Sequence, residues 1–75
     1  MKLIHRNAVN REVDSEATGR AIRSLRIKNG VAIKDVAKET KMSLSLLYAM
    51  ERGLRPWNQE KFTAVTKALK KLSRK

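Results

Sequence analysis

Residues 33–53 read IKDVAKETKMSLSLLYAMERG, and this stretch decides the fold. Its apolar residues recur at the three- and four-residue spacing of a helix, which predicts two short amphipathic helices joined by a tight polar turn. We expect the first helix over about 33–40 and the second over 43–52, with Gly53 marking the end of the second. The side chains expected to face the interior are Ile33, Val36, Ala37 and Thr40 in the first helix and Leu47, Met50 and Leu54 in the second.

The opposite side of the second helix carries side chains for which the sequence implies no buried partner. These are Ser45, Tyr48, Ala49 and Arg52. A helix that keeps one face free, on a strongly basic chain, has what a protein needs to read the major groove of DNA.

Length and charge limit what kind of protein this is. The chain has 75 residues, which suits one domain with a small hydrophobic core. Its 18 Lys and Arg outnumber its 7 Asp and Glu and leave a net charge of +11. The positive charge is spread over residues 15–57 and 58–75 rather than confined to a tail, which indicates a basic folded surface. A polyanion is therefore the expected partner, with nucleic acid first and an anionic membrane surface second.

Other classes of protein are disfavoured by what the sequence lacks. Without cysteine there are no disulfides and no thiolate metal sites, which fits a reducing cytoplasm. The start, MKLIHRNAV, has an apolar run of only two residues, so we expect neither a signal peptide nor a membrane span there.

Catalysis has little support in the sequence. His5 is the single histidine and lies in the N-terminal stretch, where a solvated role outweighs a metal-binding or catalytic one. Ser43 and Ser45 have no base at a useful spacing, and there is no Gly-rich phosphate loop. We therefore expect no enzyme activity, no metal and no cofactor.

The N-terminal part of the chain predicts an arm followed by a longer helix. Residues 1–14 form the arm, which the sequence leaves either as a short strand or as a flexible, disordered segment. Asp14 or Ser15 is expected to cap the helix, which ends near Asn29 and Gly30. The buried stripe expected on this helix is Ala17, Ala21, Ile22 and Leu25.

The C-terminal part predicts one more helix, which begins after Asn58 as its cap. Trp57 and Phe62 are expected either to complete the core or to lie at the edge of a dimer interface on this helix. The whole is an all-α domain of four helices over residues 15–73. The buried stripe expected on the last helix is Phe62, Val65, Leu69 and Leu72.

With the helices placed, the sequence of residues 19–53 resembles the Cro/C1-type (XRE-family) helix-turn-helix domains of phage and bacterial repressors. The resemblance implies a small four-helix, lambda-repressor-like domain. It also implies a cytoplasmic, nucleoid-associated transcription regulator of the repressor type, which places helix 43–52 in the major groove and binds two-fold DNA sites as a homodimer. The residues that match the family pattern are Ile22, Arg23, Leu25, Arg26, Gly30, Val36, Ala37, Met42, Ser43, Glu51 and Gly53.

Structural roles are implied for a few of the matching residues. Arg26 and Glu51 match a family pair that forms a salt bridge between the first helix and the end of the recognition helix. Ala37 has a physical reason of its own, because a larger side chain at the expected crossing of helices 33–40 and 43–52 would hold the helices apart.

The sequence departs from the family pattern at the turn and around it. Lys41 stands where the family has glycine, at a position that favours a left-handed backbone, and a non-glycine residue there costs on the order of 1 kcal/mol. Ala32 cannot cap the following helix, and Ile33 cannot make the phosphate or base contact that glutamine makes in many relatives. The recognition helix also lacks the Gln or Asn that reads adenine, which weakens the expectation of base reading by direct hydrogen bonds.

The expected DNA contacts fall into two groups. The residues expected to contact phosphates are Arg23, Lys34, Lys41, Arg52 and Arg55. The residues expected to contact bases are Leu44, Ser45, Tyr48 and Ala49, with Leu44 and Ala49 against thymine methyl groups.

Two non-enzymatic alternatives remain. One is a DNA-binding antitoxin or accessory protein whose main partner is another protein, with the apolar side chains of Leu44, Leu46 and Tyr48 facing that partner. The other is a membrane-active cationic helical protein. Against this second alternative, the glycines at Gly30 and Gly53 and the separate apolar stripes favour a folded domain.

Overall fold

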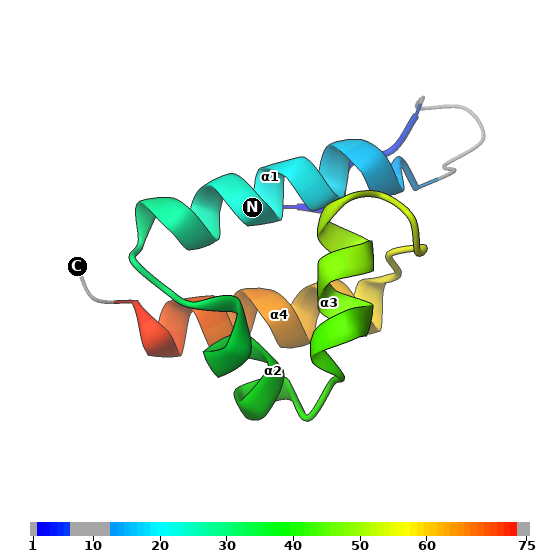
Figure 1. Cartoon of the computed structure of the whole chain (residues 1–75). Coiled ribbons are helices and arrows are strands. Elements are labelled where there is room, and N and C mark those ends of the chain that lie inside the picture. Colours follow the sequence, from blue (N-terminus) through cyan, green and yellow to red (C-terminus); the bar gives the residue numbers. More distant parts are fainter. Residues whose placement is uncertain (1, 7–12, 74–75) are drawn as a thin grey trace.

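The computed structural model describes residues 2–6 and 13–73 and places four helices in them (Figure 1). They are α1 (Ser15–Lys28), α2 (Ile33–Thr40), α3 (Leu44–Glu51) and α4 (Gln59–Leu72). The only β pairing in the described part of the chain is an isolated bridge between His5 and Val13. The predicted all-α, four-helix fold is confirmed.

Three of the helices begin at a polar side chain that caps them. The Asp14 carboxylate accepts the Ala17 N–H at 3.0 Å, the Ser43 hydroxyl accepts the Leu46 N–H at 3.0 Å, and the Asn58 amide oxygen accepts the Lys61 N–H at 2.8 Å. Each bond satisfies one backbone donor that has no partner inside its own helix. Helix α2 differs, because Ala32 provides no side-chain cap.

The hydrophobic core lies where the four helices meet. Helix α1 packs against α3 and α4, and α2 packs against the same two helices. In Figure 1, α1 and α4 run in roughly the same direction while α3 crosses them. The buried apolar residues are Ile22, Val31, Ile33, Val36, Leu47, Met50, Trp57, Phe62, Val65, Ala68 and Leu69.

Helix α1 crosses the end of α3 at a distance that only glycine permits. A Cβ atom at Gly19 would collide with the carbonyl oxygen of Met50 and lie 2.7 Å from that of Glu51. At Gly53, where φ is +76°, a Cβ atom would lie 2.7 Å from the Cα of Glu16. Two backbone segments are therefore in direct contact at this crossing, which fixes the position of α3 relative to α1.

This crossing corrects the predicted buried face of the first helix. The buried residues of α1 are Thr18, Gly19 and Ile22, whereas Ala17, Ala21 and Leu25 are only partly buried. The predicted stripe was shifted because α3 packs on the bare backbone of Gly19 rather than on an apolar side chain.

The prediction that Leu54 lies in the core is wrong. Its exposed fraction is 73%. The helical spacing from Leu47 and Met50 does not extend to Leu54, because α3 ends at Glu51 and the positive φ of Gly53 turns the chain away.

Trp57 and Phe62 complete the core of a single chain. Both are 3% exposed, and their rings meet edge to face with centroids 6.3 Å apart. The Trp57 indole N–H donates to the Met50 carbonyl oxygen at 2.9 Å. Because both side chains are buried, the alternative that they form the edge of a dimer interface is wrong.

The described part of the predicted arm lies against α1. The backbone N–H of Ile4 donates to the Thr18 hydroxyl at 3.3 Å, and the Asp14 N–H donates to the Ile4 carbonyl oxygen at 2.7 Å. Leu3 packs against the core. Residues 1 and 7–12 lie outside the described residues, so the boundaries between an arm at 1–14 and a domain at 15–73 stay predictions.

Candidate nucleic-acid interface

Helices α2 and α3 are joined by a tight turn. Lys41 has φ 61° and ψ 25°, the left-handed conformation that the sequence predicted for this position. Ser43 is extended and caps α3, so the chain reverses over very few residues. The Thr40 hydroxyl donates to the Val36 carbonyl oxygen at 2.7 Å, within the last turn of α2. This is the geometry of a helix-turn-helix unit.

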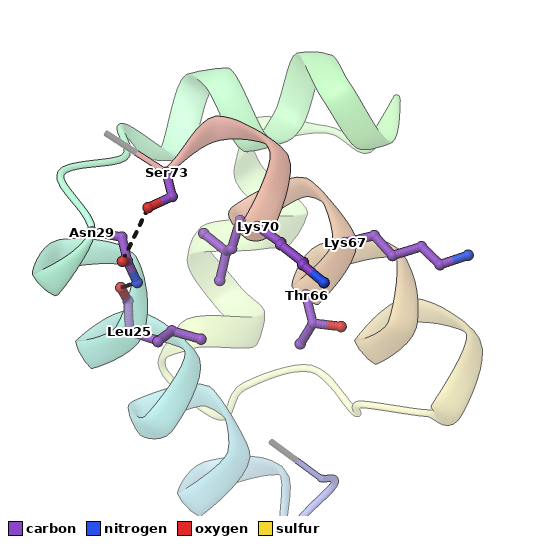
Figure 2. Close-up of a pocket in the computed structure, with 7 residues that line it drawn as sticks. Leu25, Asn29, Thr66, Lys67, Lys70 and Ser73 are labelled. Carbon is purple, nitrogen blue, oxygen red and sulfur yellow. Dashed lines mark hydrogen bonds between the residues drawn. The ribbon is translucent and has the colours of Figure 1, made fainter. Parts of the chain in front are cut away.

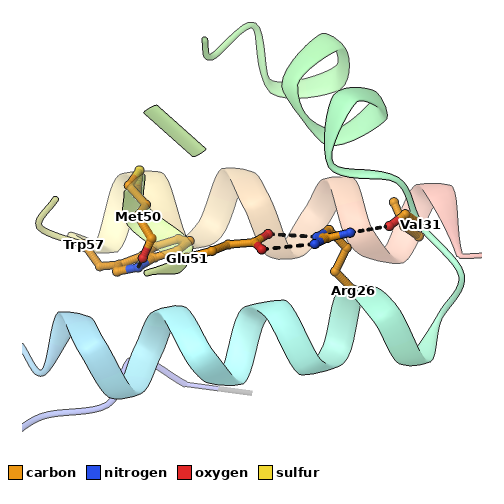
Figure 3. A network of polar contacts seen from close by, with 5 residues as sticks. All are labelled: Arg26, Val31, Met50, Glu51 and Trp57. Atoms are coloured by element: carbon orange, nitrogen blue, oxygen red, sulfur yellow. Dashed lines mark hydrogen bonds and ion pairs between the residues drawn. The ribbon is translucent and has the colours of Figure 1, made fainter. Parts of the chain in front are cut away.

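An ion pair connects the far end of α3 to α1 (Figure 3). Arg26 Nε donates to Glu51 Oε2 at 2.8 Å, and Arg26 Nη2 donates to Glu51 Oε1 at 3.1 Å. Arg26 Nη1 donates to the Val31 carbonyl oxygen at 3.0 Å. The side chains are only 14% and 5% exposed. The pair implied by the family resemblance is therefore present, and it also ties the loop before α2 to the same point.

Ala37, the other residue with an expected structural role, is partly buried and packs against the core. Helices α2 and α3 contact each other. The specific role of Ala37 at their crossing stays a prediction.

The outer side of α3 carries the residues predicted to contact bases. Leu44 is 41% and Tyr48 is 48% exposed, Ser45 is exposed, and Ala49 is half-buried. Ser45, Tyr48 and Ala49 line one shallow depression, whereas Leu44 lies outside it. Leu54 and Arg52 complete the lining. The sequence placed Leu54 in the core and therefore missed that this depression has an apolar wall.

The residues predicted to contact phosphates are all exposed: Arg23, Lys34, Lys41, Arg52 and Arg55. Among the described residues, no ion pair involves any of them. Arg23 and Arg52 line a second depression, between α1 and α3, together with Arg20, which the sequence did not single out. The other three cations lie outside this second depression. Lys34 is in the first turn of α2, Lys41 in the turn after α2, and Arg55 in the loop after α3.

A groove on another side of the molecule lies between the C-terminal ends of α1 and α4 (Figure 2). Ser73 Oγ donates to Asn29 Oδ1 at 3.2 Å, and Asn29 Nδ2 donates to the Leu25 carbonyl oxygen at 2.8 Å. None of the residues predicted to contact DNA lines this groove. Its lining residues are Leu25, Asn29, Thr66, Lys67, Leu69, Lys70 and Ser73.

In residues 2–6 and 13–73 no group of three or more His, Cys, Asp or Glu side chains is placed to hold a metal ion. None of the helices in the described part is long and apolar enough to cross a bilayer.

The tight turn, the capped α3 and its exposed outer face define the chain as a helix-turn-helix protein. A solved structure, that of the clp gene regulator ClgR from C. glutamicum, is 34% identical to this chain and matches it with a TM-score of 0.73. The match covers 75% of this chain and 73% of that chain. No protein-family model matches the sequence, and no curated protein matches it significantly. The chain belongs to the same helix-turn-helix family as ClgR.

Proposed function

We propose that this protein is a transcription regulator of the repressor type that binds double-stranded DNA selectively, and that it is of the Cro/C1 (XRE) subtype. The observation that carries the proposal is the outer side of α3, which is exposed and flanked by cations without ion-pair partners among the described residues. Helix 43–52 then enters the major groove, as a helix of this size can. The likeness to ClgR, a gene regulator, supports the same function.

Affinity in this proposal comes from phosphate contacts. Each phosphate that a Lys or Arg neutralises steepens the dependence of log K on log salt by about 0.9. The uncapped start of α2 adds backbone N–H groups that favour an anion. The cations assigned to phosphates are Arg23, Lys34, Lys41, Arg52 and Arg55.

Selectivity comes from the small and apolar side chains of α3. Leu44 and Ala49 contact thymine methyl groups, and Ser45 and Tyr48 supply hydrogen-bonding groups that adapt to more than one base. The depression bounded by Tyr48 and Leu54 supports this assignment because it offers a methyl group a partly apolar surface. The shape of the DNA supplies part of the selectivity, since no side chain here reads adenine bidentately.

The assembly that we propose is a homodimer on a two-fold site, because one recognition helix contacts few base pairs. The protein acts in the cytoplasm, at the nucleoid, by occupying its DNA site. The proposal includes no catalytic step and no cofactor.

Selection from a pool of random duplexes tests this function. We expect enrichment of a two-fold motif with thymine in each half-site and with half-sites about one helical turn apart. The same selection is repeated with Tyr48→Ala, which should still bind duplex DNA but enrich the motif poorly. A wild-type pool with no enriched motif would contradict sequence-selective binding.

One observation favours a second function, that of an antitoxin or accessory protein whose main partner is a protein. Leu44 and Tyr48, two of the three side chains predicted to face that partner, are exposed, and so is Leu54. The third, Leu46, is partly buried and packs against the core, so its assignment to the partner is wrong. Exposed apolar side chains that lie close together commonly mark protein-protein contacts. Weak duplex binding without any sequence preference would favour this second function over the first.

A further inference from the structure

The depression between α1 and α3 gathers charges of one sign. Its lining residues are Arg20, Arg23, Arg26, Tyr48, Glu51 and Arg52. Glu51 is the only acid among them, and its carboxylate is already bonded to Arg26 through both oxygens. The depression therefore keeps a large excess of positive charge.

Three of its four arginines have guanidinium groups available to a ligand. Each nitrogen of Arg26 already donates a hydrogen bond, Nε and Nη2 to Glu51 and Nη1 to the Val31 carbonyl oxygen. Arg20 meets only Glu16, at 3.3 Å and with both side chains about 70% exposed, which is a weak contact in water. Arg23 and Arg52 are exposed, and the described residues form no ion pair with them.

The three available arginines are held together by the backbone crossing described above. Arg20 directly follows Gly19 on α1, and Arg23 stands about one helical turn further on. Arg52 directly precedes Gly53, whose backbone touches α1. Like charges on rigid elements repel each other, and a bound anion relieves this repulsion without a rearrangement of the fold.

We propose that this depression holds one backbone phosphate of the bound duplex, with Arg20, Arg23 and Arg52 as its ligands. The proposal rests on the proposed DNA binding. It adds Arg20 of α1 to the interface and makes Arg23 and Arg52 parts of one site. Arginine suits this role because its planar group pairs with two phosphate oxygens at once. Tyr48 lines this depression and the neighbouring one, so the phosphate lies beside the bases that α3 reads.

Salt titrations of duplex binding test the site. The probe is a fluorescent mixed-sequence duplex of about twenty base pairs, long enough for two helical turns. The variants are Arg20→Ala, Arg52→Ala and the triple variant that adds Arg23→Ala to both, with Lys70→Ala as the control because Lys70 is exposed in the groove between α1 and α4. Circular dichroism checks that each variant is folded.

We expect Arg20→Ala to weaken binding roughly two- to five-fold, the range of one exposed ion pair. The triple variant should lower the salt slope by about 0.9 in total, because all three arginines neutralise the same phosphate. Lys70→Ala should bind like the wild type.

Three results would overturn the site. The first is unchanged binding by Arg20→Ala. The second is a salt slope reduced by about 1.8 or more in the triple variant, which indicates separate phosphates. The third is a loss of binding in Lys70→Ala equal to that in Arg20→Ala, which indicates an effect of net charge alone. If the wild type binds no duplex, the proposed function fails and the site fails with it.

Discussion

The inner and outer sides of α3 differ in almost every respect. On the inner side Leu47 is buried, and Glu51 has its ion-pair partner in Arg26. On the outer side Tyr48 and Arg52 are exposed and have no ion pair in the described structure. A helix of 8 residues is too short to be stable alone in water, so the inner contacts must hold it in place. The outer side is therefore free to serve a ligand.

The largest effect on stability is expected from removing one partner of the buried ion pair. Glu51→Ala leaves the Arg26 charge buried without a partner, which should lower the free energy of unfolding by about 3–5 kcal/mol. The double variant Arg26→Met with Glu51→Leu removes both charges and should lose less. Urea denaturation of the three proteins measures the difference. A double variant less stable than the single one would show that the unpaired charge of Arg26 is not what makes Glu51→Ala costly.

A smaller loss of stability is expected from adding a side chain where the backbone of α1 touches the end of α3. Gly19→Ala places a methyl group against the carbonyl oxygens of Met50 and Glu51, and should cost about 1–3 kcal/mol through overpacking. Ser24→Ala is the control, because Ser24 lies on the exposed surface of the same helix. Thermal melts compare the two variants. If Gly19→Ala melts at the same temperature as the control, α1 and α3 can move apart easily at their crossing. The inner side of α3 is then less rigid than the structure indicates.

The outer side can be divided into residues that give selectivity and residues that give affinity. Tyr48→Ala should lower the preference for a selected duplex over a random one by roughly ten-fold, the loss of one base contact. Arg52→Ala should weaken binding to both duplexes about equally, because a phosphate contact carries no sequence information. Competition titrations at two salt concentrations measure both quantities. The division is refuted if the two variants change binding to both duplexes in the same way.

Lys41 lies in the turn before α3 and should show the smallest effect on stability. Because its φ is 61°, Lys41→Gly relieves a left-handed strain and should raise stability by up to about 1 kcal/mol. The same change removes a predicted phosphate contact and should reduce the salt slope by about 0.9. Lys41→Asn is the control, since asparagine tolerates this backbone and also lacks the charge. Melting and duplex titration of both variants separate strain from charge.

Local sequence patterns were enough to predict the helices and several of their ends. The caps at Ser43 and Asn58 depend on neighbouring residues alone, so they could be predicted from short-range spacing. The left-handed backbone at Lys41 was implied by the glycine that the resembling family has at that position. The all-α fold followed from the same spacing.

Features that depend on the packing of distant segments could not be predicted in this way. The contact of Gly19 with the end of α3 joins residues far apart in the sequence, and nothing local distinguishes it from a glycine that merely weakens a helix. Leu54 fits a helical spacing, but the helix ends before it. Arg20 became a candidate ligand only when the structure placed it beside Arg52.

The burial of Trp57 gives this protein an internal fluorescent reporter. It is the single tryptophan in the chain, the residue is 3% exposed, and its indole N–H is bonded to the last turn of α3. Its emission should shift to longer wavelength as soon as that turn detaches from the core and water reaches the ring. A ligand that binds on the opposite side of the helix should leave the emission maximum in place, so detachment of α3 and occupancy of its outer side can be followed separately in an unlabelled sample.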